Sequence, residues 1–470
     1  MSERLPGLLQ ALTQGETLAR NKGGAVLVVF SLASERLDPL RLFAANRQVL
    51  GQSLFWSSDR GALAMAGFGC TEEISPGADD RFNASAVAWQ ALLSQAHQVG
   101  PRQPLLCGGF AFDPKGPRSL KWQSFAATSL VLPRILLLRD AEQHHVIFSQ
   151  WLEPGADVVR CAQSLETQWT LLLSRYASAP RQEIPHGTPS DENVISAQQW
   201  QDTVATAVQR INAGDMRKVV LAREVRLTTS RTIPCGPLLE NLKASYPQAY
   251  QFAFSRGDSC FLGATPERLV RVARGTLNTV ALAGTCPRGR HEQQDAELGQ
   301  ALMDSPKDRH EHALVVQTLR EALQPYCAVL DIASQPQLHR LANVQHLLTP
   351  VMGRLHPQVQ LLQLVQALHP TPAVGGLPRR EAMAYIREYE QLDRGWYAAP
   401  VGWMNAQGDG EFAVALRSAL IRGCEAHLFA GCGIVAESDP KSEYEETCLK
   451  LRTVRDALRP SGVVQVTSAG

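Results

Sequence analysis

Two hydrophobic periods follow one another along the chain, and together they predict a mixed architecture. Arg217–Leu227 (RKVVLAREVRL) alternates between apolar and polar positions and is rich in β-branched residues, which is typical of a strand. Just before it, Ser196 and Gln199 form a capping-box pattern, and apolar residues at helical spacing follow. Short apolar runs at Ala25–Leu32 and Ser129–Leu138 predict further strands.

Turn residues divide the second half of the chain into more strands. Trp396–Met404 and Glu411–Ile421 are alternating runs, and residues 405–410 between them have the Asn and Gly content of a hairpin. Thr279–Gly289 and Ala430–Ile434 are expected to end in glycine turns, and exposed N–H groups at such a turn can bind a carboxylate. Strands with short connections, interleaved with long helices, predict an α+β fold with large antiparallel sheets.

One segment is the best candidate for a linker. Residues 176–193 are rich in Pro, Ser and charge and poor in apolar residues. They divide the chain into an N-terminal part, residues 1–180, which we expect to add strands and helices to the fold, and a C-terminal part, residues 195–470, which contains all of the candidate site residues described below. In the second part Leu368–Pro378 (LHPTPAVGGLP) is punctuated by Pro and Gly, which indicates an irregular loop of the kind that lines pockets.

Composition excludes several classes of function. The 470 residues carry a formal net charge of +1, so no bulk field attracts nucleic acid or a membrane surface. The N-terminus lacks the pattern of a signal peptide, and no apolar run has the length of a membrane span. The 10 cysteines contain no CxxC pair or zinc spacing. We therefore expect a soluble, cytoplasmic protein that binds neither nucleic acid nor membrane.

Two segments place carboxylates in line on a predicted helix. In Ser438–Leu458, Glu443, Glu446 and Lys450 fall on one face, and the alternative is a solvated Glu–Lys pair. In Ser305–Leu319, SPKDRHEHALVVQTL, Asp308 and Glu311 are likewise three residues apart, although Asp308 also fits a capping box with Ser305. Two such helices can hold a Mg²⁺ ion, which prefers oxygen ligands and leaves positions for an anionic substrate.

Three further residues are candidates for chemistry, each with a plain structural alternative. Lys218 begins the alternating strand beside small apolar residues, where desolvation would lower its pKa, or its ammonium simply lies in water. Glu267 lies in a Pro turn between two predicted strands. Arg417 shares a face with alanines that leave room for a ligand carboxylate, or it is a surface arginine on an edge strand.

Ten motifs in a fixed order make the sequence resemble the chorismate-utilising enzymes, and among them the isochorismate synthases. They are KVVLAR, TPERL, ALAGT, KDRHEH, VQHL, LHPTPAVGG, RGWYAAPVGW, ALRSALI, AGCGIV and EYEETCLK, between residues 196 and 459. The first half, including GGFAFDPKGPR, is most similar to isochorismate synthases of salicylate-based siderophore pathways, of the pyochelin type. The resemblance implies two facing antiparallel sheets wrapped by helices, a monomer, and a Mg²⁺-dependent conversion of chorismate to isochorismate.

The resemblance also implies a role for each matching residue. Lys218 matches the general base that activates water to attack ring carbon 2, and Glu267 matches the general acid that protonates the hydroxyl leaving carbon 4. Glu311 and Glu446 match the Mg²⁺ ligands, with Asp308 and Glu443 as their outer partners. The residues that match the family's substrate contacts are Gly284, Thr285, His346, Ala373, Val374, Tyr397, Arg417, Gly431 and Lys450.

Several alternatives remain open. A salicylate synthase would form isochorismate and then eliminate pyruvate in the same pocket. An aminating anthranilate or aminodeoxychorismate synthase would use ammonia, but Lys218 favours water over the anthranilate type, and the aminodeoxychorismate type would place a lysine where this chain has Ala283. A non-catalytic chorismate sensor would not need both an acid and a base. The sequence does not decide whether isochorismate feeds salicylate, catecholate siderophore or menaquinone synthesis.

Overall fold

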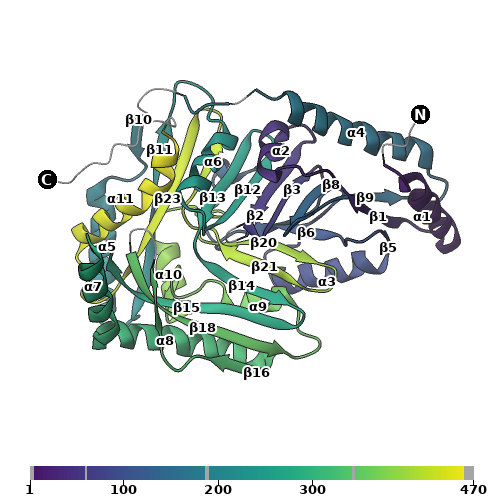
Figure 1. The fold of residues 1–470 in the computed structure, drawn as a ribbon. Helices are drawn as coiled ribbons and strands as arrows, with labels where there is room; N and C mark the ends of the chain where they lie inside the picture. The colour runs from purple at the N-terminus through teal and green to yellow at the C-terminus, as the bar shows by residue number, and fades with distance from the viewer. Residues whose placement is uncertain (1–4, 59–60, 181, 186–189, 341–343, 460–470) are drawn as a thin grey trace.

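The computed structural model describes residues 5–58, 61–180, 182–185, 190–340 and 344–459. Within these residues the chain forms two large sheets with helices packed around them (Figure 1). The helices are α1 (Leu8–Lys22), α2 (Pro39–Asn46), α3 (Arg81–Ser94), α4 (Val158–Ser178), α5 (Ala197–Asn212), α6 (Cys235–Ser245), α7 (Glu292–Asp304), α8 (Pro306–Leu323), α9 (Leu361–Leu368), α10 (Arg379–Tyr389) and α11 (Pro440–Ala457). No helix in the described ranges is long and apolar enough to cross a membrane.

The larger sheet has 13 strands and joins both parts of the sequence. In spatial order its main path is β10 (Ser190–Asn193), β11 (Lys218–Thr228), β23 (Glu425–Ile434), β22 (Ser418–Arg422), β13 (Ser259–Thr265), β12 (Tyr250–Arg256), β2 (Gln52–Ser57), β3 (Leu63–Phe68), β8 (Ile135–Asp140), β9 (Gln143–Leu152), β1 (Val26–Ala33) and β5 (Ala96–Val99). The short strand β19 (Gly376–Leu377) also pairs with β11, at the other end of the edge that β10 occupies. Its strand pairs are antiparallel except β1 with β5.

The smaller sheet has 10 strands and also mixes the two parts. Its order is β16 (Cys327–Ile332), β18 (Val344–Leu355), β15 (Thr276–Pro287), β14 (Arg268–Ala273), β21 (Gly410–Val414), β20 (Pro400–Asn405), β6 (Leu105–Phe110), β7 (Thr128–Leu132) and β4 (Glu72–Ile74), with β17 (Gln337–Arg340) paired to β18. The predicted α+β fold with two facing antiparallel sheets is thus confirmed, with the β1–β5 pair as the parallel exception.

Two hydrophobic clusters hold the layers together. One lies between the sheets, where Trp396, Phe261 and Phe412 are buried. The other fills the space between the larger sheet and the helices that cover its outer face, with Leu165 of α4 and Leu238 of α6 among its members. Helices α5 and α11 pack against each other at one end of the larger sheet, and α7 and α8 pack on β15 of the smaller one (Figure 1).

Two predicted strands are wrong in the same way, because each is two strands in different sheets. Residues 129–138 divide at Pro133 into β7 of the smaller sheet and β8 of the larger one, since proline lacks the N–H group that a continuous ladder needs. Residues 411–421 divide at Arg417, which has a φ of 49° and links β21 to β22. Arg417 therefore lies where the chain crosses between sheets, and the alternative of an edge-strand arginine is excluded.

Other local predictions need smaller corrections. The expected glycine turn of residues 279–289 is part of β15, which continues to Pro287 past a register shift at Gly284. The turn expected at residues 430–434 is the end of β23, paired with β11. The expected linker overlaps the end of α4 and includes β10, while residues 181 and 186–189 lie outside the described residues. The helix at Ser196–Gln199 does begin with the predicted capping box.

Candidate active site

Lys218 is the first residue of β11 and reaches the first predicted carboxylate. Its Nζ lies 3.1 Å from Oε1 of Glu311 on α8, and its side chain is 17% exposed. On the neighbouring strand β23, Gly433 pairs with Val220, and a Cβ added there would come within 2.7 Å of the Lys218 Cε. A glycine at this position leaves the space that the lysine stem occupies. This role of Gly433 was not predicted, although the alternating glycines of AGCGIV are a signal in the sequence for such space.

Glu267 lies half-buried between β13 and β14, in the same site as three cations. Burial raises the pKa of Glu267 to about 7, and the positive charges of Arg417, Lys218 and Lys450 oppose that rise. An electrostatic effect of this kind requires that the three cations lie near the Glu267 carboxyl. The structure therefore brings together Lys218 and Glu267, the predicted base and acid, and leaves the carboxyl able to hold a proton near neutral pH.

Lys450 joins α11 to β23 at the other side of the site. Its Nζ donates a hydrogen bond to the carbonyl of Gly431 at 3.0 Å and lies 2.5 Å from Oε1 of Glu446, four residues earlier in the helix. The helix begins after Asp439, whose side chain accepts from the N–H of Ser442, with proline at the first helical position. The predicted helix is confirmed, and it directs Lys450 toward the strand that pairs with β11.

The two outer carboxylates are each held by a serine at the start of their helix. Oδ2 of Asp308 accepts from the Ser305 hydroxyl at 2.5 Å, so the structural alternative that the sequence left open for Asp308 is present in the fold. Oε1 of Glu443 accepts from the Ser438 hydroxyl at 2.7 Å. In the described ranges no three His, Cys, Asp or Glu side chains form a ready-made metal site. The four acids, which the sequence led us to expect around one ion, are instead bonded to lysines and serines.

The donor chemistry nevertheless fits magnesium. Mg²⁺ is usually bound by one or two carboxylates, and water and substrate oxygens complete its six positions, so a cluster of three protein ligands is not required. Glu311 and Glu446 are both partly open to solvent, with side chains 37% and 48% exposed. Their present partners, Lys218 and Lys450, both act electrostatically on Glu267. The two glutamates therefore come from different helices and each pairs with a lysine whose charge acts on Glu267.

A bulge in β15 places the next pair of predicted residues. Gly284 has a φ of 76°, and the ladder between β15 and β18 shifts there, so that Thr285 stands opposite His346. The Thr285 hydroxyl lies 2.8 Å from Nδ1 of His346. Desolvation, with the nearby positive charges of His339, Arg417 and Lys450, lowers the pKa of His346 to about 4. His346 is therefore neutral at pH 7 and offers a hydrogen-bonding ring without a charge.

Tyr397 and Arg417, which were predicted to bind a carboxylate, lie close enough for each to act on the pKa of the other. Tyr397 is buried and stacks on Phe429, with 5.2 Å between ring centroids, and burial raises the pKa of its phenol to about 12. Desolvation lowers the pKa of Arg417, while the charges of Glu446 and Glu267 support its protonated form. The phenol thus stays protonated at neutral pH and, like the guanidinium, can donate a hydrogen bond to an anion.

The last two predicted residues occupy different environments. Val374 is 2% exposed and packs into the cluster between the sheets, whereas Ala373 is exposed. His312, next to Glu311 on α8, is buried and bonds to the carbonyl of Ala283 and the hydroxyl of Thr349. It fixes α8 against the smaller sheet and does not take part in the candidate site.

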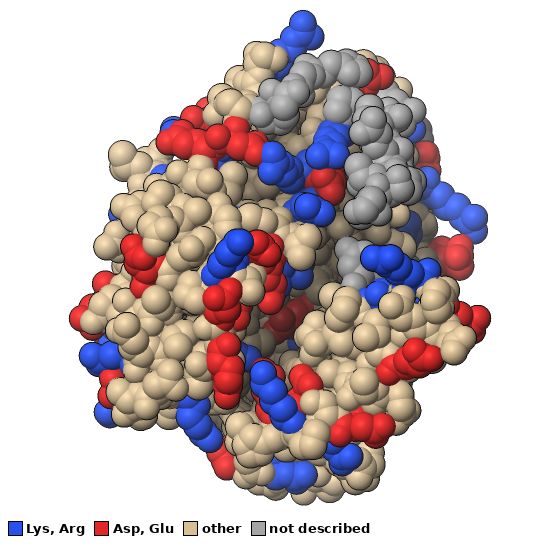
Figure 2. All heavy atoms as spheres, turned by 90° about the vertical axis from the view of Figure 1, so that its left-hand side faces the viewer, with Lys and Arg blue, Asp and Glu red and all other residues tan. Residues whose placement is uncertain are grey.

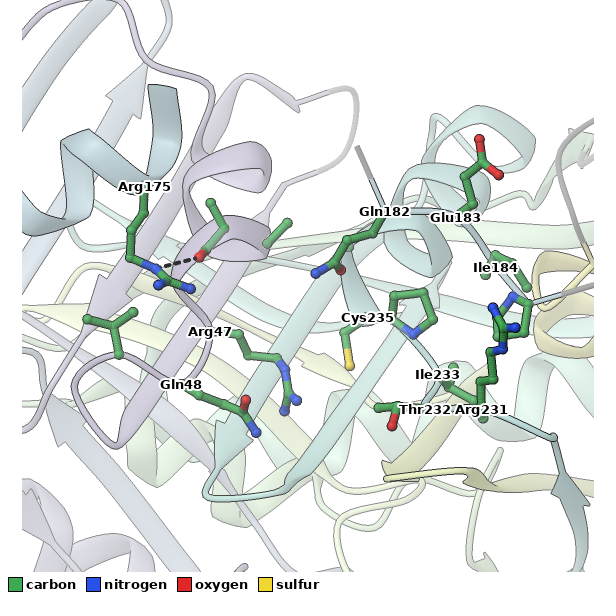
Figure 3. A pocket seen from close by; sticks show the side chains of 16 residues that line it. Arg47, Gln48, Arg175, Gln182, Glu183, Ile184, Arg231, Thr232, Ile233 and Cys235 are labelled. Carbon is green, nitrogen blue, oxygen red and sulfur yellow. Dashed lines mark hydrogen bonds between the residues drawn. The ribbon is translucent and has the colours of Figure 1, made fainter. Parts of the chain in front are cut away.

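The helices that carry the predicted carboxylates lie on one side of the molecule. Seen from that side, the surface is hollowed near its middle, and acidic and basic side chains gather in and around the hollow (Figure 2). A second cavity, of about 730 Å³, lies elsewhere, between α2, α4 and the start of α6 (Figure 3). Among the described residues its lining includes Arg47 and Arg175 but none of the predicted site residues. The chemistry and this cavity are therefore separate features.

Comparison with known proteins agrees with this geometry. The sequence profile of the family described as chorismate binding enzyme matches residues 10–459. The chain belongs to this family. A salicylate biosynthesis isochorismate synthase of Pseudomonas aeruginosa is 45% identical over 459 residues, which cover 96% of this chain and 94% of that protein. The isochorismate synthase MenF of Bacillus subtilis is 35% identical, with 94% and 95% covered.

Solved structures place other chorismate-binding enzymes on the same fold. The menaquinone-specific isochorismate synthase MenF of Escherichia coli superposes with a TM-score of 0.79 at 26% identity, over 96% of this chain and all of that one. The two sheets, with strands contributed by both parts of the sequence, are therefore the architecture of the family. The relatives also show that the resemblance seen in the ten motifs extends along nearly the full chain.

Proposed function

We propose that the protein converts chorismate to isochorismate. The observation that carries this proposal is the raised pKa of Glu267, about 7, in a site that also contains the amine of Lys218. Moving a hydroxyl from ring carbon 4 to ring carbon 2 requires an acid for the leaving hydroxyl and a base for the attacking water. Similarity to two isochorismate synthases over more than nine-tenths of the chain supports the same reaction.

In the proposed mechanism the protein moves two protons. Lys218, as the free amine, removes a proton from a water molecule, and the resulting oxygen attacks carbon 2 of the ring. Glu267 donates its proton to the hydroxyl at carbon 4, which leaves as water, so one water enters and one departs. Arg417, Lys450 and the Tyr397 hydroxyl bind the carboxylates of the dianionic substrate and fix the ring between acid and base.

We further propose that Glu311 and Glu446 hold a Mg²⁺ ion, with Asp308 and Glu443 as outer partners. When bound, the ion supplies positive charge that neutralises a substrate carboxylate. Lys218 and Lys450 would then exchange their present glutamate partners for water and substrate. This would also release the Lys218 amine from its contact with Glu311, so that it could reach a water molecule beside the substrate.

The product is best assigned by direct chemistry. Purified protein, chorismate and Mg²⁺ should yield isochorismate without pyruvate, resolved by chromatography. Formation of salicylate and pyruvate would identify a salicylate synthase, and an absence of turnover with Mg²⁺ present would contradict the proposed reaction. We propose that isochorismate feeds salicylate synthesis, because the 45% identical relative is named for that pathway. We also propose that the protein is a cytoplasmic monomer that binds neither nucleic acid nor membrane. Size-exclusion chromatography of the purified protein tests the oligomeric state through its apparent mass.

A further inference from the structure

The outer edge of β11 has a gap that no strand fills. Beside its first residues, β19 pairs with Lys218 and Val219, and beside its last residues β10 pairs with residues 225–228. Between these two short neighbours, the described structure places no strand against residues 220–224 on this edge. The backbone here is buried, and buried N–H and C=O groups without partners destabilise a fold by about 1–3 kcal/mol each.

Two charged side chains occupy the gap in place of a strand. The N–H of Ala222 donates to Oε2 of Glu390 at 2.8 Å, and Nη2 of Arg394 donates to the carbonyl of Val220 at 2.7 Å. The N–H of Val220 itself donates to the carbonyl of Gly375, at 2.9 Å. Along this edge the backbone of β11 is therefore hydrogen-bonded first to the loop, then to the Glu390 and Arg394 side chains, and then to β10.

Glu390 and Arg394 are bound to each other as well as to the strand. Nε and Nη2 of Arg394 donate to the two carboxylate oxygens of Glu390, at 2.6 and 2.5 Å, and the guanidinium lies over the ring of Phe112. Only 4% of Glu390 and 3% of Arg394 is exposed. A buried ion pair is weak evidence for stability, because apolar residues of similar volume are often as stable in its place. Its contacts beyond the pair therefore indicate what it does.

The remaining arm of the guanidinium reaches the loop that precedes β19. Nη1 of Arg394 donates to the carbonyl of Val374 at 2.9 Å. Val374 belongs to the loop expected to line the ring pocket, and Val220 lies two residues from Lys218, on the same face of β11. One planar group thus contacts both the Val374 loop and the strand that carries the proposed base. The planar fork of arginine can hold three acceptors at fixed angles, which the single ammonium of a lysine cannot do.

We propose that the Glu390–Arg394 pair is a positioning element that sets the distance between the Val374 loop and Lys218. The pair does not touch the substrate. It acts by holding the substrate ring and the Lys218 amine at the distance that the reaction needs. The inference therefore rests on the proposed function. A displacement of about 1 Å between reacting groups lowers turnover by about 100-fold, so loss of the pair should appear mainly in kcat.

The test compares Arg394→Lys and Glu390→Gln with a variant of a buried carboxylate that lies on β11 itself. Glu224 of β11 has a side chain that is 3% exposed, and it is ion-paired with Lys121 and bonded to His427, away from the Val374 loop. In steady-state kinetics with chorismate, Arg394→Lys and Glu390→Gln should lower kcat about 10- to 100-fold with a smaller change in KM. Glu224→Gln should lower the unfolding midpoint but leave kcat within about threefold of wild type.

Amide hydrogen exchange supplies a readout that does not depend on turnover. Exchange at Ala222 should rise in Arg394→Lys and Glu390→Gln, measured where each variant is folded, and stay at the wild-type rate in Glu224→Gln. The positioning role is wrong if the wild type turns over chorismate and both Arg394→Lys and Glu390→Gln keep the wild-type kcat. It is also wrong if Glu224→Gln loses as much kcat as those two variants. An inactive wild type would instead overturn the proposed function, and this inference with it.

Discussion

The chemistry of the site depends on how single residues are desolvated. Glu267 is a carboxyl whose pKa is raised by burial to about 7 even though three cations oppose the rise. His346 is affected in the opposite sense, because the same desolvation removes the charge from an imidazole and lowers its pKa to about 4. Burial thus favours a protonated acid and a neutral histidine near the same two cations, Arg417 and Lys450, which suits the proposed binding of a dianion and delivery of a proton.

The protonation of Glu267 makes turnover depend on pH in a defined direction. Because the acid must carry its proton, kcat/KM should fall about tenfold per pH unit above the pKa of about 7 and level off below it, as far as this group is concerned. In Glu267→Gln, kcat should drop about 100- to 10,000-fold, and this basic limb should vanish from what remains. The measurement is kcat/KM between pH 5.5 and about 9, at saturating Mg²⁺. A wild-type profile flat through pH 7–9 would assign the proton donor elsewhere.

The space beside Lys218 is a second property of one residue. In Gly433→Ala the new methyl group would stand 2.7 Å from the Lys218 Cε, so the lysine stem must shift. We expect kcat to fall about 10- to 100-fold, with little change in the far-ultraviolet circular dichroism. Gly24→Ala is the matched control, because a Cβ there meets no atom within 4 Å. Equal activity of both variants would show that Lys218 does not need its present position.

At the level of elements, the sequence predicts what local interactions decide. The caps of α8 and α11, the capping box of α5, the strand β11 and the 405–410 hairpin all follow from side chains within a few residues of one another. The crossings at Pro133 and Arg417 could not be predicted in this way. The first lies in a short apolar run and the second in an alternating run, each of which fits one strand, and only the packing of two sheets decides that the chain must change from one sheet to the other.

The candidate site follows the same division between local and tertiary information. The i,i+3 carboxylates of α8 and α11 could be found from spacing, as could Lys218 at the start of its strand. The partners of these groups could not, because Lys218 and Glu311 are 93 residues apart and meet only in the fold. Arg394 and Glu390 were not singled out, since an i,i+4 ion pair in a sequence looks the same whether it lies in water or buried against a strand.

The start of α8 offers a test at this scale. Ser305 caps the helix by accepting from the Asp308 N–H, and its hydroxyl also binds the Asp308 carboxylate. Ser305→Ala should lower the free energy of unfolding by about 1 kcal/mol, measured by urea denaturation. Ser305→Thr keeps the hydroxyl and should lie within about 0.5 kcal/mol of wild type. If Ser305→Ala and Ser305→Thr lower the free energy of unfolding equally, the hydroxyl cap contributes nothing. The loss would then come from the changed size and shape of the side chain.

For the whole molecule, the two sheets must keep a fixed relation because the site takes residues from both. Lys218 and Gly431 come from the larger sheet, Thr285 and His346 from the smaller one, and Glu267 and Arg417 from the segments that connect them. Strands from each part of the sequence lie in each sheet, so the first 180 residues are part of the frame that sets this relation. We expect from this that neither part alone retains the site, and that the packing between the sheets is its main support.

A polar contact through that packing can be removed without touching the site. The Tyr250 hydroxyl of β12, in the larger sheet, donates to Oε1 of Glu411 of β21, in the smaller sheet, at 2.9 Å, and both side chains are buried. Tyr250→Phe removes this donor from a buried carboxylate, so the free energy of unfolding should fall by about 2 kcal/mol. The control Tyr326→Phe changes a phenol for which the described structure gives no hydrogen-bond partner, and should cost less than about 0.5 kcal/mol.

Stability and turnover should separate in Tyr250→Phe. Because Glu411 also lies within 3.8 Å of Arg268, the carboxylate keeps a charged neighbour and the sheets should stay in register. We therefore expect kcat within about threefold of wild type at a temperature where the variant is folded, alongside a lower urea midpoint. A large loss of kcat without loss of stability would mean that this hydrogen bond determines the distance between the sheets. The aromatic core alone would then not hold the two sheets in the position that the site needs.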